Sequence, residues 1–286
     1  MTLIDAIGGP QGDLLGLSRL LGGALAEDRG EARRKLIARF QNPGLLRESL
    51  RRLRGAGYRA VLTLGEGRLF EALGRHPASD LPVPLPVVPN LQGFMREAVE
   101  FGMLGAGLRR AWRVGPLALA GLSLRGVGRL PALARREFPA MVQSFIELEL
   151  ADFIRYDPPV VFLQAQMTDL ALAFNNPRIL EAFFAAVRAR TGGAAGLLTA
   201  NFGALGAALK SWGLETEAVI APFNAAGEQM RPDREQCLHA AKACEFPIWA
   251  DRLGRPDPPD AADRSVMDQG GLAGAVREDQ GLWLGP

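Results

Sequence analysis

Short apolar runs in this chain repeatedly end in a side-chain amide or a carboxylate. In chain order the terminal residues are Glu66, Asn90, Gln164 with Gln166, Asn201, Asn224 and Asp251. Carboxylates can act as general acids or bases, and amides both donate and accept hydrogen bonds. Together these residues predict a site that orients a small polar organic molecule and moves protons on it.

The two carboxylates are the candidate catalytic residues. Glu66 lies between two glycines in LGEGRL, where the backbone can approach a ligand closely, and we expect it to be the general base. Asp251 is the candidate second acid or base. Each has a structural alternative, which is a salt bridge to a nearby arginine, Arg68 for Glu66 and Arg252 for Asp251.

The other polar residues are candidate substrate-binding groups. They are Asn90, Gln164, Gln166, Asp169, Asn201, Asn224 and Arg231, with Asp169 and Arg231 expected in adjoining loops. The alternative is that Asn and Asp follow strands because they cap the next helix or adopt turn conformations. Gln and Glu are poor caps, so capping explains the whole set less well than it explains one position.

The elements that must position these residues alternate along the chain. We expect strands in TLIDAIGG near the start, at 59–65 and in the run ending at Asn90, and then at 159–166, 196–201, 217–224, 247–251 and 281–285. Continuous apolar strands are typical of a parallel sheet that is covered on both faces. Eight strands separated by helices predict a (β/α)8 TIM-like barrel, which carries its site at the carboxyl ends of the strands. An open doubly wound parallel sheet is the alternative.

We expect one α/β domain over residues 1–286, with a helical insertion at 91–157 after the third strand. The prolines of VPLPVVPN predict that this third strand lies at an edge or entry of the sheet. The run NNP at 175–177 should divide the helical stretch 168–191 into two pieces. A helix near 264–278 should precede the last strand at 281–285, and no eighth helix is expected after it.

The segment 104–138 is basic and amphipathic, with arginines among leucines and Trp112. Such a segment can pack on the barrel, form a lid, join two copies of the chain or contact an anionic membrane. It supports a second, non-catalytic hypothesis, a binding or scaffold protein that uses 104–138 on a membrane or protein partner. A homo-oligomer is compatible with either hypothesis.

Composition excludes several classes of protein. The formal net charge of +2 argues against a nucleic-acid binder, and no apolar run is long enough to predict a transmembrane helix. No signal peptide is predicted, and Cys237 and Cys244 lie too far apart in one predicted helix to form a disulfide. We therefore expect a cytoplasmic protein.

Other chemistries find little support in the residues. None of the three lysines ends a strand, which argues against a Schiff-base enzyme, and no G-x-S-x-G, G-x-G-x-x-G or Walker A motif follows a strand. No histidine cluster predicts a metal site, and no cofactor is required. A lyase or isomerase is favoured over a hydrolase or oxidoreductase, although a flavin-dependent barrel oxidoreductase or a divalent cation held by carboxylates stays open.

Overall fold

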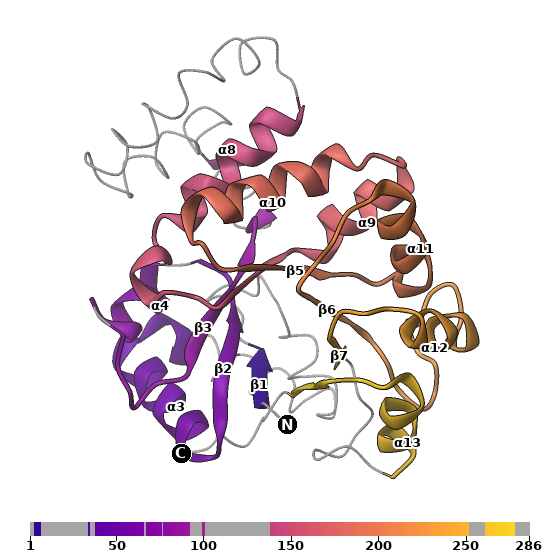
Figure 1. The fold of residues 1–286 in the computed structure, drawn as a ribbon. Helices are drawn as coiled ribbons and strands as arrows, with labels where there is room; N and C mark the ends of the chain where they lie inside the picture. Colours follow the sequence, from indigo (N-terminus) through magenta and orange to yellow (C-terminus); the bar gives the residue numbers. More distant parts are fainter. Residues whose placement is uncertain are drawn as a thin grey trace.

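The computed structural model describes residues 3–6, 34, 38–65, 67–75, 77–91, 99–100, 138–251 and 261–277. Strands and helices alternate through these residues, and every strand pairing is parallel (Figure 1). The chain thus has the parallel α/β architecture that its apolar runs predicted. Among the described helices, none is both long and apolar enough to cross a membrane.

The strands pair in the order in which they occur in the sequence. They are β1 (Leu3–Ala6), β2 (Tyr58–Thr63), β3 (Val83–Val88), β4 (Val160–Leu163), β5 (Ala194–Leu198), β6 (Ala218–Pro222), β7 (Ile248–Asp251) and β8 (Gly274–Arg277). Strand β8 also pairs with β1, so the ring of pairings closes. The register sets Pro222 of β6 opposite Asp251 of β7, which brings the carboxyl ends of these two strands level.

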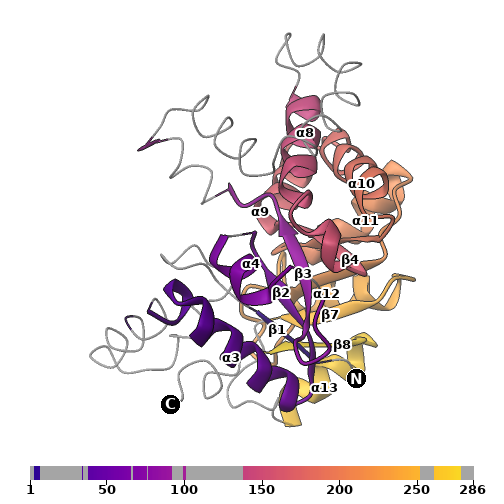
Figure 2. The ribbon, with the colours of Figure 1, turned by 90° about the vertical axis from the view of Figure 1, so that its left-hand side faces the viewer.

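Helices connect each strand to the next. They are α3 (Pro43–Gly55), α4 (Gly67–Leu73), α8 (Phe138–Leu150), the 3-10 turn η2 (Ile154–Tyr156), α9 (Ala165–Ala173), α10 (Arg178–Arg190), α11 (Phe202–Trp212), α12 (Arg234–Lys242) and α13 (Ala261–Gly270). Helices α8 and α10 lie side by side in both views (Figure 1 and Figure 2). The expected insertion at 91–157 contains α8 and η2 among the described residues. The basic segment 104–138 lies outside the described residues, except for Phe138.

Local sequence signals explain several helix ends. The Asn42 side chain caps α3 by accepting from the backbone N–H groups of Gly44 and Leu45, and Pro43 occupies the first helical position. The predicted break at NNP is confirmed, because α9 ends at Ala173 and α10 begins at Arg178. Between them Asn175 adopts a φ of 46°, a left-handed conformation that Asn tolerates.

The prediction for the end of the chain is wrong in one respect. Residues 274–277, expected in a helix over 264–278, form strand β8, which pairs with β7 and β1. Helix α13 ends at Gly270, and Gly271 has a φ of 65°, a conformation suited to glycine after a helix. The apolar run 281–285, expected to be the eighth strand, lies outside the described residues.

Strand β3 is not at an edge, so of the two expected positions, an edge or an entry, the edge is wrong. It lies between β2 and β4. Its two prolines, Pro84 and Pro86, pair in register with β2, whereas pairing with β4 begins only at Val87. The strand accommodates both prolines because they precede the segment that needs hydrogen bonds on its β4 side.

Alternate strand residues face two separate apolar regions. An inner cluster includes Leu62, Leu64 and Val87, together with Phe162 and Ile220. Residues of the opposite parity pack outward against the helices, in the clusters that contain Val61, Val161, Leu197, Val219 and Ala250. This two-sided burial explains why the strands are apolar throughout, and it defines which positions point into the ring.

Candidate functional site at the strand ends

Asp251 is the last residue of β7 and lies on the inner side of that strand. Trp249 packs against the inner cluster and Ala250 against the outer one, so alternation places Asp251 on the side of Trp249. The residue is 7% exposed. Its backbone carbonyl accepts from the N–H of Phe223, which ties the ends of β6 and β7 together. A buried carboxylate therefore stands at the carboxyl end of the ring, as the sequence predicted.

Gln164 and Asn90 lie together where β3 and β4 end, and both are buried. The N–H of Gln164 donates to Val88 O over 2.8 Å, and the Gln164 Oε1 atom is 3.5 Å from the N–H of Leu91. The N–H of Asn90 donates to Glu149 Oε2 over 2.7 Å. These contacts hold the loop after β3. At 3.5 Å the hydrogen bond from Leu91 is weak, so the Gln164 side-chain oxygen is only weakly bonded within the protein.

Two glutamates of α8 were missed by the sequence reasoning. Glu149 accepts from the loop after β3, and Glu147 is 2% exposed, with its Oε1 atom accepting from Gln143 Nε2 over 3.2 Å. Helix α8 contacts β3, so both carboxylates belong to the same region of the fold as Asn90. The signal was present in the run FIELEL, where two acids interrupt an otherwise apolar helix.

Asp169 lies in α9 and not in a loop as expected. Its carboxylate accepts from Thr199 Oγ1 over 2.6 Å and from the N–H of Ala200 over 3.2 Å. Thr199 Oγ1 in turn accepts from the N–H of Asn201 over 2.9 Å. Asp169 therefore holds the loop between β5 and α11, and Thr199 faces α9 because β5 has already ended at Leu198.

The side chain of Asn201 is not used for capping. Asn201 occupies the N-cap position of α11, yet its side chain makes no capping hydrogen bond. Its Oδ1 atom is buried without a hydrogen-bond partner in the described structure, and so is Thr168 Oγ1 of α9. A buried acceptor costs about 1–3 kcal/mol when no donor pairs with it.

Asn224 has a clear structural role. Its Nδ2 atom donates to Glu228 O over 2.9 Å, and its Oδ1 atom accepts from the N–H of Glu228 over 2.8 Å. Gly227, with a φ of 71°, completes the turn. The turn conformation given as the alternative for such residues is therefore present at Asn224, and its role in substrate binding stays a prediction.

Gln166 and Arg231 are exposed. Gln166 lies in the first turn of α9, because β4 ends at Leu163 and not at 166 as expected. Arg231 contributes its backbone carbonyl, which accepts from the N–H of Gly203 over 3.0 Å and from Cys237 Sγ over 3.2 Å. The Arg231 side chain is exposed, unlike Asn90, Gln164 and Asp251, which are buried.

Glu66 lies outside the described residues, as does the segment 252–260. Leu62 and Leu64, which precede Glu66 with the same parity, do lie in the inner cluster. Arg68, the expected partner of Glu66, lies 3.8 Å from Glu71 in an exposed ion pair. Within the described residues no three His, Cys, Asp or Glu side chains gather as metal ligands would.

Comparisons with known proteins add little to this geometry. No protein-family model matches the chain, and no curated protein matches it. Among solved structures, an N-acetylmannosamine-6-phosphate 2-epimerase from Clostridium perfringens is similar, with 10% identity and a TM-score of 0.44, over 96% of this chain and 85% of that one. At this similarity neither the fold nor the reaction of the epimerase carries over to this chain.

Proposed function

We propose that the chain is a (β/α)8-class enzyme with its site at the carboxyl ends of the strands, and that it performs acid–base chemistry of the lyase or isomerase type on a small polar organic molecule. The sequential strand order and the pairing of β8 with β1 support this class over an open doubly wound sheet. In this class the carboxyl ends of the strands carry the catalytic residues.

One observation carries the proposal. Just after β5, an amide oxygen of Asn201 is buried without a donor among the described residues, and at the end of β7 the carboxylate of Asp251 is buried on the inner strand side. Neither arrangement is explained by helix capping. A ligand hydroxyl or amide that donates to Asn201 would remove the cost of its unpaired oxygen.

Each residue then has a defined part. Asp251 exchanges a proton with the substrate, and Glu66 is the second acid–base group. The amides of Gln164 and Asn201 orient the substrate, and an amide N–H that donates to a developing oxyanion lowers the barrier to proton removal. Asn90 belongs to the loop after β3, which contacts Gln164, and Asp169 acts by holding Asn201 in place.

Native mass spectrometry with an absorbance spectrum of freshly purified protein is the first test. A retained small polar molecule and a colourless protein are the expected result. A yellow protein with bound flavin would replace the lyase or isomerase assignment with an oxidoreductase.

The second test compares variants. A panel of sugars, hydroxy acids and amino acids is screened by thermal shift and for turnover, and the responding compound is retested on Asp251→Asn. We expect this variant to fold and its turnover rate to fall by a factor of about 10²–10⁴. Glu181→Gln, an exposed change on α10, is the matched control. Turnover by Asp251→Asn at the control level would overturn the catalytic assignment.

A further inference from the structure

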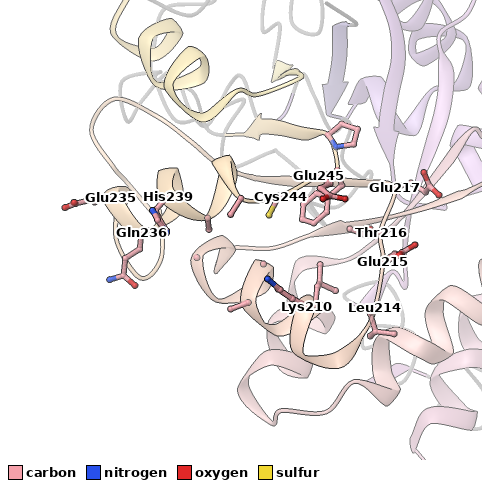
Figure 3. A pocket seen from close by; sticks show the side chains of 18 residues that line it. Lys210, Leu214, Glu215, Thr216, Glu217, Glu235, Gln236, His239, Cys244 and Glu245 are labelled. Carbon is pink, nitrogen blue, oxygen red and sulfur yellow. The ribbon is translucent and has the colours of Figure 1, made fainter.

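A second feature lies on the helical side of the ring, along α11 and α12. A groove of about 970 Å³ opens between α11 and α12, and its lining includes the residues just before β6 and β7 (Figure 3). Neither Asp251 nor Asn201 is among the residues that line it. The groove is therefore separate from the strand-end site, and its occupant does not depend on the proposed reaction.

Small and apolar residues form much of the groove wall. Helix α11 contributes Gly206 and Ala207, α12 contributes Ala240, and Ala243 and Phe246 follow α12. A Cβ atom on Gly206 would lie 3.3 Å from Cys244 Sγ, so a larger side chain at this position would crowd Cys244. Gly206 and Ala240 lie where α11 and α12 pack on each other, whereas Ala207 and Ala243 are exposed beside this contact and leave space for a partner.

The rim of the groove is strongly acidic. Four exposed carboxylates line it, those of Glu215, Glu217, Glu235 and Glu245. In the part of the chain that is described, none of them forms a salt bridge. Lys210 and His239 are the basic side chains of the lining. Figure 3 shows Glu235 on α12 and Glu215 and Glu217 before β6, on opposite sides of the groove.

We propose that this groove binds a basic amphipathic helix of a partner protein. The apolar wall receives the apolar face of that helix, and the four carboxylates pair with its arginines or lysines, which is the helix-in-groove mode of recognition. Helix α11 has 11 residues, or about 16 Å, so the groove accommodates roughly three turns of helix. Charge complementarity selects a basic partner over an acidic one.

The probe is a synthetic peptide helix of leucine and arginine, with a leucine and glutamate peptide of equal length as its counterpart. Fluorescence anisotropy is measured at low and high salt. We expect the arginine peptide to bind, with an affinity that falls as salt rises, and the glutamate peptide to show no binding. Equal binding of both peptides would overturn the proposal.

Variants locate the binding on the protein. The combined change Glu217→Gln, Glu235→Gln and Glu245→Gln should weaken the arginine peptide about tenfold, because each exposed ion pair contributes little by itself. Ala207→Trp, a change at an exposed position, should block the groove without altering its charge. Glu181→Gln is the control on α10. Unchanged affinity in the triple variant and in Ala207→Trp would overturn the proposal.

Cys244 supplies a readout inside the groove. It is partly exposed and lines the groove, whereas Cys237 is fully buried. Bound arginine peptide should slow alkylation of Cys244, measured by intact mass. Sedimentation of the wild type and the triple variant tests the other occupant, a second copy. Self-association that the triple change abolishes would assign the groove to a dimer and overturn the proposal.

Discussion

The carboxylate of Asp169 in α9 accepts a hydrogen bond of 2.6 Å from the hydroxyl of Thr199, 30 residues further along the chain. The same hydroxyl accepts from the N–H of Asn201. Asp169 thus reaches Asn201 through Thr199 and through the bonded N–H of Ala200. Asp169 holds the loop that carries Asn201. Both of its carboxylate oxygens already accept hydrogen bonds from the protein, and a substrate would have to displace these bonds in order to bind Asp169 directly.

Asp169→Ala should destabilise the fold by about 1–3 kcal/mol, because it leaves the Thr199 hydroxyl and the Ala200 N–H without their acceptor. Urea unfolding measures the change. Asp268→Ala, at an exposed position of α13, is the control and should stay within about 0.5 kcal/mol of the wild type. Equal stability of the two variants would show that the Asp169 bonds do not hold the loop.

Gly196→Ala should destabilise the inner cluster by about 1–3 kcal/mol or more through overpacking. A Cβ atom at this position would lie 2.5 Å from Cε1 of Phe162 and 3.2 Å from the carbonyl of Ala218. Thermal unfolding measures the loss. Phe162→Leu added to Gly196→Ala should restore part of the stability by making room, and failure of that rescue would contradict the steric explanation.

Gly55→Ala is the matched control for the change at Gly196. A Cβ atom on Gly55, the last residue of α3, would meet nothing within 4 Å. The alanine has a higher helix propensity, by at most about 1 kcal/mol, so the variant should be as stable as the wild type or slightly more stable.

Tyr156 should contribute stability that is lost at alkaline pH. Its hydroxyl donates to Gly74 O over 2.5 Å, and burial raises the pKa of the phenol above its ordinary value of 10.0. A raised pKa in the folded state gives stability that is complete below the unfolded-state value and is lost as pH rises through the folded-state value.

Tyr156→Phe tests the Tyr156 prediction. The variant should lose about 0.5–1.5 kcal/mol at neutral pH, from the bond to Gly74, and should show a weaker alkaline decline of stability than the wild type. Ultraviolet titration of wild type and variant identifies the tyrosine involved, because the chain contains two. Identical alkaline unfolding curves would contradict this role.

Both cysteines should react slowly with alkylating reagents at neutral pH. Burial raises the pKa of the Cys237 thiol and of the Cys244 thiol, and the thiolate is the reactive form. Alkylation followed by intact mass should accelerate as pH rises, with Cys244 reacting before the fully buried Cys237. Rapid modification of both thiols at neutral pH would contradict their burial.

The sequence by itself determined the alternation of helices and strands, the parallel arrangement and the end of the sheet where polar residues gather. These properties are local or periodic. An apolar run covered on both faces indicates a buried parallel strand, and NNP interrupts a helix wherever it occurs. The positions of Asp251 and Gln164 followed from the same rules, because each residue ends or directly follows such a run.

Only the tertiary structure decided what each polar side chain contacts. Asn224 closes its own turn, Gln166 enters the exposed first turn of α9, and Asp169 bonds to a loop that is distant in the sequence. Strand β8 was missed because GAVR is too short and mixed to stand out, and it becomes a strand by pairing with β7 and β1. Residue type and periodicity specify a face, whereas a contact depends on where each strand ends and which element packs beside it.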